Sequence, residues 1–255
     1  MLSCRAFRQH LAAALLLLIL AIPGVATAQP TQADWPPELT EVWEPEPTIV
    51  TPGDGTAPPS DAIVLFGGED LSAWEAARGG PAPWRVADGA FTVVPASGGI
   101  RTVQKFESVQ LHIEFRTVSE IRGEGQGRSN SGVFFHEQYE VQVLDSYQNR
   151  TYSNGQAGSV YKQHAPLVNA SKPPGTWQAY DIFFEAPAFS TDGRLIKPAF
   201  VTVIHNGVLI QNHVEIRGRT EYIGLPGYEA HGRGAIALQD HGNPISFRNI
   251  WIREL

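Results

Sequence analysis

Beyond residue 61 the chain is a succession of short segments in which apolar and polar residues alternate, with Gly, Pro, Asn and Asp between them. Leu111, Ile113 and Phe115 alternate with polar neighbours, and a period of two is that of a strand with one buried face. No amphipathic helix of useful length fits this region. The pattern predicts strands over 62–66, 84–87, 90–94, 109–117, 131–136, 139–145, 158–163, 177–185, 199–205, 208–213, 235–239 and 245–254.

The connections between these segments constrain the architecture. The pair Asn206-Gly207 predicts a two-residue hairpin turn, because both residues tolerate the left-handed backbone conformation. Many short strands without helices to cover a sheet predict an all-β sandwich or jelly roll. Four polar stretches are longer than connections need to be, and we expect them to build walls around a binding face. These stretches are 119–130, 146–157, 164–176 and 218–234.

Residues 1–28 have the pattern of a cleavable secretory signal peptide. Arg5 and Arg8 precede an apolar run over 11–22, and Ala26-Thr27-Ala28 fits a small-residue cleavage site. The run is short for a membrane span and no second apolar stretch follows it, so no membrane insertion is expected. We predict a mature chain that begins near Gln29 and is periplasmic or secreted.

The cysteine content and the net charge indicate where the protein acts and what kind of ligand it binds. Cys4 is the single cysteine and precedes the apolar run, so the mature chain has no disulfide and no lipidated cysteine. An exported chain without disulfides favours a bacterial periplasm. Removal of Arg5 and Arg8 leaves 17 basic against 26 acidic residues, a net charge of about −9. This charge disfavours nucleic acid as a partner and suits a small neutral ligand such as a sugar.

The mature chain divides by composition. The stretch 29–60 is rich in proline and has almost no apolar periodicity, so it is expected to be an extended spacer or an arm. Trp35 and Trp43 are the exceptions in this stretch and could dock the arm on the body. We expect one β-rich domain over 61–255, a size that such domains commonly reach.

The segment 139–145 carries polar groups where a core strand would carry aliphatic ones. Glu140 and Gln142 share one face, and the preceding segment 131–136 is expected to pair with this strand as a hairpin. One β-bulge would bring Asp145 to the same face, and bulges often aim side chains at active sites. Two carboxylates flanking a carboxamide predict a sugar-processing cleft. The alternative is an ordinary solvated strand face.

A second polar group of residues lies near the end of the chain. Gln239 and His241 share one face by alternation, at the end of an apolar strand. Their face matches that of Glu140 and Gln142, so we expect the four side chains to line one pocket. The alternative is an ordinary turn. The histidines of the chain lack the helical or Cys/His spacing of a recognisable metal motif, so no ligand set is assigned.

Further candidates for substrate contact lie at strand ends and in loops. His136 and His164 are two of them. Tyr161 and Lys162 lie on opposite faces of one segment, so at most one of the two faces a cleft. Trp177 is either a core aromatic, which we expect, or a stacking surface for a sugar ring. The sequence contains neither a phosphate-binding loop nor a nucleophile-elbow motif.

Several motifs occur together in an order that resembles the 3-keto-disaccharide hydrolase family. They are 130–135 (NSGVFF), 139–145 (YEVQVLD), 175–180 (GTWQAY), 205–208 (HNGV), 238–242 (LQDHG) and 247–250 (FRNI). The resemblance covers about residues 61–255 and is most specific in the final block. It implies a concanavalin A-like jelly roll of two antiparallel sheets with a concave ligand face.

The 139–145 strand is also similar to the Glu-x-Asp-x-x-Glu catalytic strand of laminarinase-type glycosidases. Gln142 replaces the central acid of that motif and Asp145 shortens the last one. These departures disfavour an ordinary double-displacement glycosidase. His136 stands where the 3-keto-disaccharide hydrolase family more often has Arg.

The family resemblance implies cleavage of 3-keto-glycosides. A ketone at C3 acidifies the hydrogen on C2, so a base can remove that proton, the C1 substituent leaves by β-elimination, and water then adds. A divalent metal that polarises the C2 and C3 oxygens is compatible with this chemistry. The residues assigned to catalysis are Glu140, Asp145 and His241, with Glu140 as base or metal ligand and either His241 or His164 sharing in proton transfer. Those assigned to substrate binding are Gln142, His136, Tyr161, Lys162, His164, Trp177 and Gln239.

A non-catalytic carbohydrate-binding module is the main alternative, because concanavalin A-like folds host both enzymes and binding modules. A binding module would keep aromatic surfaces and tolerate the loss of acids. This chain keeps two acids and several histidines, which favours an enzyme. In both cases the expected partner is a small carbohydrate.

Overall fold

The computed structural model describes residues 35–255, and the predicted signal peptide over 1–28 lies outside the described residues. The chain divides into two compact units, Met1–Thr48 and Ile49–Leu255. The described part of the first unit contains one short 3₁₀ helix, η2 (Pro37–Thr40). Its two tryptophans, at positions 35 and 43, are 56% and 80% exposed, so neither indole is buried.

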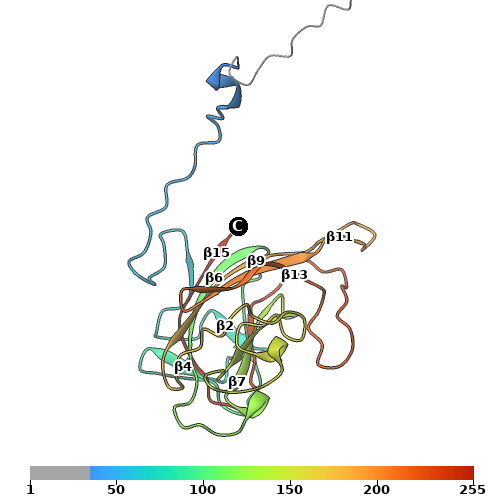
Figure 1. Cartoon of the computed structure of the whole chain (residues 1–255). Coiled ribbons are helices and arrows are strands. Elements are labelled where there is room, and N and C mark those ends of the chain that lie inside the picture. The colour runs from blue at the N-terminus through green and yellow to red at the C-terminus, as the bar shows by residue number, and fades with distance from the viewer. Residues whose placement is uncertain (1–34) are drawn as a thin grey trace, which may run out of the picture. The chain divides into compact units, whose positions relative to one another are not determined.

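The second unit is a sandwich of two antiparallel sheets (Figure 1). Its strands are β1 (Ile63–Phe66), β2 (Trp74–Ala76), β3 (Arg85–Ala87), β4 (Ala90–Thr92), β5 (Ile100–Thr102), β6 (Val109–Arg116), β7 (Asn130–Phe135), β8 (Tyr139–Leu144), β9 (Gln178–Glu185), β10 (Ala188–Phe189), β11 (Leu195–Lys197), β12 (Ala199–His205), β13 (Val208–Ile216), β14 (Ala237–Leu238) and β15 (Ser246–Glu254). The larger sheet has the order β13-β12-β9-β6-β15-β4-β3, and the smaller has the order β2-β5-β14-β7-β8. The predicted all-β jelly-roll sandwich is confirmed.

Strand β15 has an unusual place for the last strand in chain order. It pairs with β6 on one side and with β4 and β1 on the other. It therefore lies inside the larger sheet and not at its edge. Two 3₁₀ helices, η3 (Gly125–Gly127) and η4 (Ser153–Gly155), interrupt the long loops. No α-helix occurs in residues 35–255.

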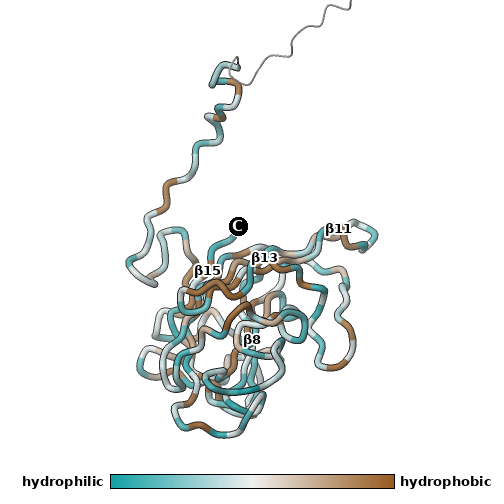
Figure 2. The backbone as a smooth tube through the Cα atoms, in the orientation of Figure 1, coloured by the Kyte–Doolittle hydropathy of each residue, from teal (hydrophilic) through white to brown (hydrophobic). Residues whose placement is uncertain are grey.

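The hydrophobic core fills the space between the two sheets. Phe135 of β7 stacks on Phe184 of β9 with ring centroids 4.7 Å apart, which joins the smaller sheet to the larger. Phe91 contacts Phe247 within the larger sheet at 5.7 Å. In Figure 2 the hydrophobic colour follows strands such as β8, β13 and β15, whereas most connecting loops are hydrophilic.

The strand predictions hold for most of the sandwich and fail at two kinds of site. The Asn206-Gly207 turn is confirmed, with both residues at positive φ between β12 and β13. Residues 158–163 are not a strand, because Gly158 and Lys162 have positive φ and only Val160 forms isolated bridges. The short strands β2, β5, β10 and β11 were not predicted, because two or three residues carry too little alternation to be recognised.

Residues 49–60 belong to the folded unit, whereas the sequence places them in the arm. Thr56 explains why. Its carbonyl accepts hydrogen bonds from Trp251 Nε1 and Asn249 Nδ2, each at 3.0 Å, and its hydroxyl donates to Glu114 Oε1 at 3.2 Å. This segment therefore lies along the outer face of the larger sheet.

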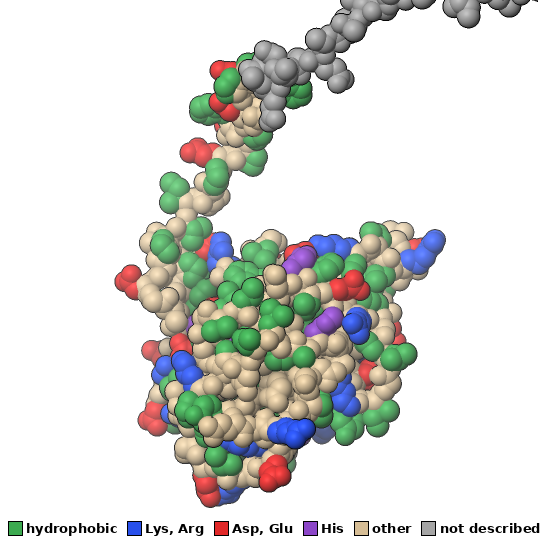
Figure 3. Space-filling model, viewed as in Figure 1, with side chains coloured by type: hydrophobic (Ala, Val, Ile, Leu, Met, Phe, Trp, Pro, Cys, Tyr) green, Lys and Arg blue, Asp and Glu red, His purple; other side chains and the backbone are tan. Residues whose placement is uncertain are grey.

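The surface of the sandwich mixes charge of both signs. Basic and acidic side chains are interspersed over the face of the domain that Figure 3 shows. Within residues 35–255, no helix has the length and apolar character needed to cross a membrane.

Candidate active site

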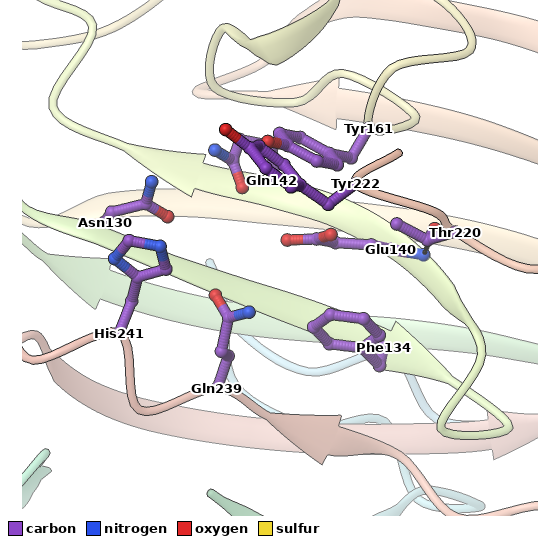
Figure 4. A pocket seen from close by; sticks show the side chains of 9 residues that line it. All are labelled: Asn130, Phe134, Glu140, Gln142, Tyr161, Thr220, Tyr222, Gln239 and His241. Carbon is purple, nitrogen blue, oxygen red and sulfur yellow. Dashed lines mark hydrogen bonds between the residues drawn. The ribbon is translucent and has the colours of Figure 1, made fainter. Parts of the chain in front are cut away.

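A cavity of about 270 Å³ lies over strands β7 and β8 of the smaller sheet. Glu140, Gln142, Gln239 and His241 all line it, as the matching alternation of two distant segments predicts. No Lys or Arg is among its lining residues, so the cavity suits a ligand without negative charge. The lining residues are Asn130, Phe134, Glu140, Gln142, Tyr161, Thr220, Tyr222, Gln239 and His241 (Figure 4).

The period of the two strands explains why these side chains meet. The apolar residues at alternate positions of β8 belong to the core, so Glu140 and Gln142 point to the opposite face. The register of the hairpin pairs Phe134 with Glu140 and Gly132 with Gln142. Asn130, two residues before Gly132, shares the same face. The hairpin thus places one carboxyl and two carboxamides on the wall of the cavity.

Gly132 creates the space that Glu140 occupies. A Cβ atom at position 132 would overlap Glu140 Oε1 and would lie 2.8 Å from Phe134 Cε2. Side-chain atoms this close must move, so a methyl group at position 132 would displace the Glu140 carboxyl. The glycine is therefore a requirement of the observed Glu140 position.

The Glu140 carboxyl lies in an environment that disfavours its charge. The residue is only 4% exposed, and burial raises the pKa of its carboxyl to about 8. With that pKa, roughly a tenth of the carboxyl groups are ionised at neutral pH. A group that titrates near neutrality is suited to accept and return a proton.

Gln142 has two amide orientations with different contacts. With its nitrogen toward Gln126, it donates to Gln126 Oε1 at 2.9 Å. With the amide turned, its nitrogen donates to Glu140 Oε1 and to the Ser131 carbonyl, each at 3.0 Å. The turned orientation gives the Glu140 carboxyl a neutral hydrogen-bond donor.

Gln239 and His241 approach the cavity from the segment that follows β14, and Figure 4 shows both side chains directed toward the space beside the Glu140 carboxyl. The backbone of Gln239 is fixed by two hydrogen bonds: its N–H donates to the Gly132 carbonyl at 3.1 Å, and its carbonyl accepts from Ser131 Oγ at 2.7 Å. Its Oε1 atom is buried and has no hydrogen-bond partner. An unpaired buried acceptor beside a cavity is a place for a ligand hydroxyl.

Tyrosines form the wall on the other side of the cavity. Tyr161 and Tyr152 share a hydrogen bond of 2.6 Å between their hydroxyls, and burial together with this bond raises the pKa of Tyr161. Lys162 Nζ lies 4.2 Å from the ring centroid of Tyr222 and donates to the Tyr222 carbonyl at 2.6 Å. The Thr220 hydroxyl accepts a hydrogen bond from the Glu140 N–H at 3.0 Å. These bonds connect two long loops to strand β8.

Four lining residues were not among the sequence candidates. Asn130 and Phe134 could have been found, because they alternate with core residues of β7 just as Glu140 does along β8. Thr220 and Tyr222 could not be selected individually, since they lie in the loop 218–234 that was predicted only as a wall.

Asp145 lies outside the cavity, contrary to the expected bulge. Strand β8 pairs regularly with β7 through Leu144, so no inserted residue turns Asp145 toward Glu140. Its carboxylate forms an ion pair with Arg128, with Nε and Oδ2 2.7 Å apart, and both side chains are buried. Its other oxygen accepts from the Tyr147 N–H at 3.2 Å. The assignment of Asp145 as a catalytic carboxylate is therefore withdrawn in favour of a structural role.

Three other candidates also lie outside the lining. His136 borders a separate cavity, where its Nε2 donates to the Glu107 carbonyl at 3.1 Å and burial lowers its pKa to about 4. His164 Nε2 bonds the Glu215 carbonyl at 2.8 Å. Lys162 is exposed and contacts the back of Tyr222. Of the pair Tyr161 and Lys162, Tyr161 alone lines the cavity, although the two residues do not lie on the strand from which their opposite facing was predicted.

Trp177 is neither in the core nor in the Glu140 cavity. It is half-buried on the larger sheet, and the guanidinium carbons of Arg116 and Arg248 lie 4.7 and 4.2 Å from its ring centroid. The expectation of a core aromatic is wrong, because the indole packs against two cations on the outer face. It also cannot stack on a sugar bound at Glu140.

The cavity does not make a dedicated metal site. In the part of the chain that the structure describes, no group of three or more His, Cys, Asp or Glu is placed to hold a metal ion. The cavity supplies one carboxyl, one imidazole and several carboxamides. Protein sites for divalent ions with oxygen ligands usually contain more carboxylate groups than the single one in this cavity.

Comparison with known protein families shows to which family the chain belongs. Residues 61–253 match the model of the 3-keto-alpha-glucoside-1,2-lyase-like domain. The chain belongs to this family. The match confirms the resemblance drawn from the motifs, and the lyase-like domain spans the sandwich from β1 to β15. A comparison with curated proteins gave no match.

Solved structures resemble the lyase-like domain at two levels. A crystal structure of a candidate glycosyl hydrolase from Parabacteroides distasonis is 54% identical, with a TM-score of 0.84, and the alignment covers 89% of this chain and 100% of that one. A second candidate glycosyl hydrolase from the same organism is 23% identical, with a TM-score of 0.54, and the alignment covers 76% of this chain and 99% of that one. The second likeness concerns the fold alone.

Proposed function

We propose that the chain is an exported carbohydrate-active enzyme that cleaves 3-keto-glycosides by C2 deprotonation, β-elimination and hydration. The observation that carries this proposal is the buried Glu140 carboxyl, whose pKa is raised to about 8 in a cavity lined otherwise by neutral polar groups. Membership of the lyase-like family and the similarity to a candidate glycosyl hydrolase support it.

Glu140 is the proposed base. The C2 hydrogen of a 3-keto sugar is acidified by the neighbouring ketone, so a carboxylate of raised pKa has enough basicity to remove it. The proton passes to Glu140, the electron pair forms the C2–C3 enolate, and collapse of the enolate expels the C1 substituent. Water then adds across the C1–C2 double bond, which completes net hydrolysis.

Other groups of the cavity are suited to the remaining tasks. His241 lines the same cavity as Glu140 and is the proposed proton donor to the departing oxygen. Gln239 Oε1, buried and unpaired, is proposed to accept a hydrogen bond from a sugar hydroxyl. The side-chain amide nitrogen of Gln239, which also lines the cavity, can donate to the oxygen on which negative charge develops, the role of an oxyanion hole.

The same geometry argues against a double-displacement glycosidase. Retaining enzymes require two carboxyl groups about 5–5.5 Å apart, one as nucleophile and one as acid. Glu140 is the single carboxyl among the lining residues, and Asp145 is held by Arg128. Elimination from a 3-keto sugar needs one base and not two carboxyls.

Export is proposed on the sequence pattern of residues 1–28 alone. N-terminal sequencing of the protein recovered from its native host should give a first residue at or near Gln29. Recovery of a chain that still begins at Met1 would refute export by this route.

The deciding assay compares a 3-keto-disaccharide with its unoxidised parent, with and without a chelator. Release of monosaccharide from the keto form alone is expected. Binding without release would support the alternative of a carbohydrate-binding module, and release from the parent would support a conventional glycosidase. Loss of activity in chelator that is restored by one divalent ion would show that a metal assists Glu140.

Activity should rise with pH toward the pKa of Glu140. A base acts only when ionised, so in His241→Asn, which lacks the proposed proton donor, kcat/KM should increase about tenfold per pH unit below about pH 8 and then level off. The measurement is kcat/KM for the 3-keto-disaccharide at several values on both sides of that pKa, with the enzyme-free elimination rate subtracted at each. A profile that is flat or falls across this range would remove Glu140 as the base.

Gly132→Ala should reduce turnover while the sandwich still folds. The added methyl group displaces the Glu140 carboxyl, and a misplacement of about 1 Å can cost about 10²-fold in rate. Gly232→Ala is the matched control, because a Cβ at that position meets nothing within 4 Å. Circular dichroism and melting curves of both variants should show retained β structure. Equal turnover in the two variants would contradict the role of Gly132.

A further inference from the structure

A second and larger cavity, of about 550 Å³, lies on the other sheet. It follows a row of residues that pair directly across four neighbouring strands. Arg85 of β3 pairs with Thr92 of β4, Thr92 with Ser246 of β15, and Ser246 with Arg116 of β6. Directly paired residues of antiparallel strands point to the same face, so the row forms the floor of a groove. We name it the arginine groove.

The opposite side of this row is core, which fixes the arginine groove on the outer face of the larger sheet. The next residue of β4, β15 and β6 along the row is Phe91, Phe247 and Phe115 respectively, and all three are fully buried. The active-site cavity lies on the smaller sheet, so the arginine groove is separate from it.

The arginine groove contains two arginine side chains that form no ion pair within the described chain. Neither Arg85 nor Arg116 forms a hydrogen bond or ion pair with another residue of the described chain, whereas Arg248 nearby is bound to Glu114 at 2.6 Å. Asp88 is the one carboxylate among the lining residues, so the lining keeps a net positive charge. This is notable in a chain of net charge −7.

The Arg116 side chain is positioned by an aromatic contact and not by a carboxylate. Its guanidinium carbon lies 4.7 Å from the ring centroid of Trp177, which also lines the groove. Cation–π contact restrains the side chain while its N–H groups stay available. Between the two arginines, Thr92 Oγ1 and Ser246 Oγ lie 2.8 Å apart and present a pair of hydroxyls.

The spacing of the row selects the size of the ligand. Arg85 and Arg116 are three strand spacings apart, about 14 Å between their backbones. The row is therefore longer than a single sugar ring. Guanidinium groups bind carboxylates in bidentate fashion, and hydroxyl pairs bind sugar hydroxyls.

We propose that the arginine groove binds an acidic oligosaccharide, with one uronate carboxylate at Arg85, another at Arg116, and the intervening hydroxyls at Thr92 and Ser246. Such a site would keep the protein on a polymer of uronic acids while the active-site cavity on the smaller sheet handles a small substrate. The proposal does not depend on the chemistry assigned to Glu140.

The test is calorimetric titration of the full chain with trigalacturonate at low ionic strength. Binding is expected, and it should weaken with added salt because the contacts are ionic. Arg116→Ala and Arg85→Ala should each lower the affinity about tenfold to a hundredfold. Arg194→Ala, which removes an exposed arginine on the β10–β11 hairpin, is the charge-matched control and should bind as the unaltered chain does.

Several outcomes would overturn the proposal. They are absence of binding, equal binding of neutral galactotriose, equal binding of triglutamate, or affinity unaffected by both groove substitutions. Loss of binding in Glu140→Gln would place the ligand in the active-site cavity instead. Arg85 is exposed at the edge strand, so Arg85→Ala tests the groove even if Arg116→Ala disturbs the packing of Trp177.

Discussion

Glu140→Gln should abolish most of the turnover of 3-keto-disaccharides and leave the fold intact. The substitution keeps the shape of the side chain and removes the group that accepts the C2 proton. Loss of a general base costs about 10²–10⁴-fold in rate. Steady-state kinetics should show the fall in kcat, while binding of the keto sugar, followed by calorimetry, should change far less because the carboxamides of the cavity still contact its hydroxyls.

Glu137→Gln is the matched control for this experiment. It removes a carboxyl from the turn of the same β7–β8 hairpin, outside the cavity, where the side chain pairs with Arg101 at 2.9 Å. Its turnover should equal that of the unaltered chain. If Glu140→Gln also kept full turnover, the assignment of the base would fall even though the family membership stands.

Glu140→Gln should also make the protein more heat-stable at alkaline pH. The folded pKa of about 8 lies above the ordinary value of 4.5, so the native state favours the protonated carboxyl. That stabilisation is complete below about pH 4.5 and is lost as pH rises through about 8. Glutamine is neutral at every pH, so melting curves should coincide in acid and diverge in favour of the variant near pH 8. Superimposable curves at all pH values would show that the carboxyl is not held protonated.

Asp145→Asn should destabilise the domain strongly without changing the chemistry of the folded fraction. The Arg128 guanidinium would be left buried beside a neutral amide, with side-chain exposures of 9% and 2% for the two residues. Removal of one partner from a buried ion pair costs about 3–5 kcal/mol. Urea unfolding should show a lower midpoint, and the kcat of the folded fraction at low temperature should be unchanged.

Asp192→Asn is the control, because Asp192 pairs with Arg194 on the surface, where an ion pair contributes little. A normal unfolding midpoint for Asp145→Asn, combined with a large fall in kcat, would return Asp145 to the active site as the sequence first suggested.

The contrast between Glu140 and Asp145 shows what the sequence can and cannot predict here. Glu140 and Gln142 were placed correctly because strand alternation is local and has a fixed period. Gln239 and His241 lie beyond the end of β14, and the backbone bonds of Gln239 to Ser131 and Gly132 hold that segment at the cavity. Asp145 was misplaced because a β-bulge was assumed, whereas the regular alternation of β8 turns position 145 away from the face of Glu140. There it pairs with Arg128, which lies 17 residues earlier in the chain.

The predictions for Trp177 and for the loop residues Thr220 and Tyr222 depend on contacts made elsewhere in the fold. Trp177 lies just before β9, whose alternation buries Tyr180 and Ile182 and so directs position 177 to the outer face, where Arg116 and Arg248 contact the indole. Thr220 and Tyr222 reach the cavity through a loop whose path is set by side-chain bonds to strand β8 and to Lys162. The polar composition of the loop 218–234 predicts that it borders the cavity, but only tertiary contacts determine which of its residues line it.

The internal position of β15 has a consequence for biosynthesis. The strand completes contacts with β6, β4 and β1, so the larger sheet stays open until the last residues of the domain have left the ribosome. We expect the nascent chain to stay loosely folded until then and to expose apolar surface that chaperones bind. Under the proposed export by residues 1–28, the sandwich would close after translocation, when β15 inserts between its neighbours.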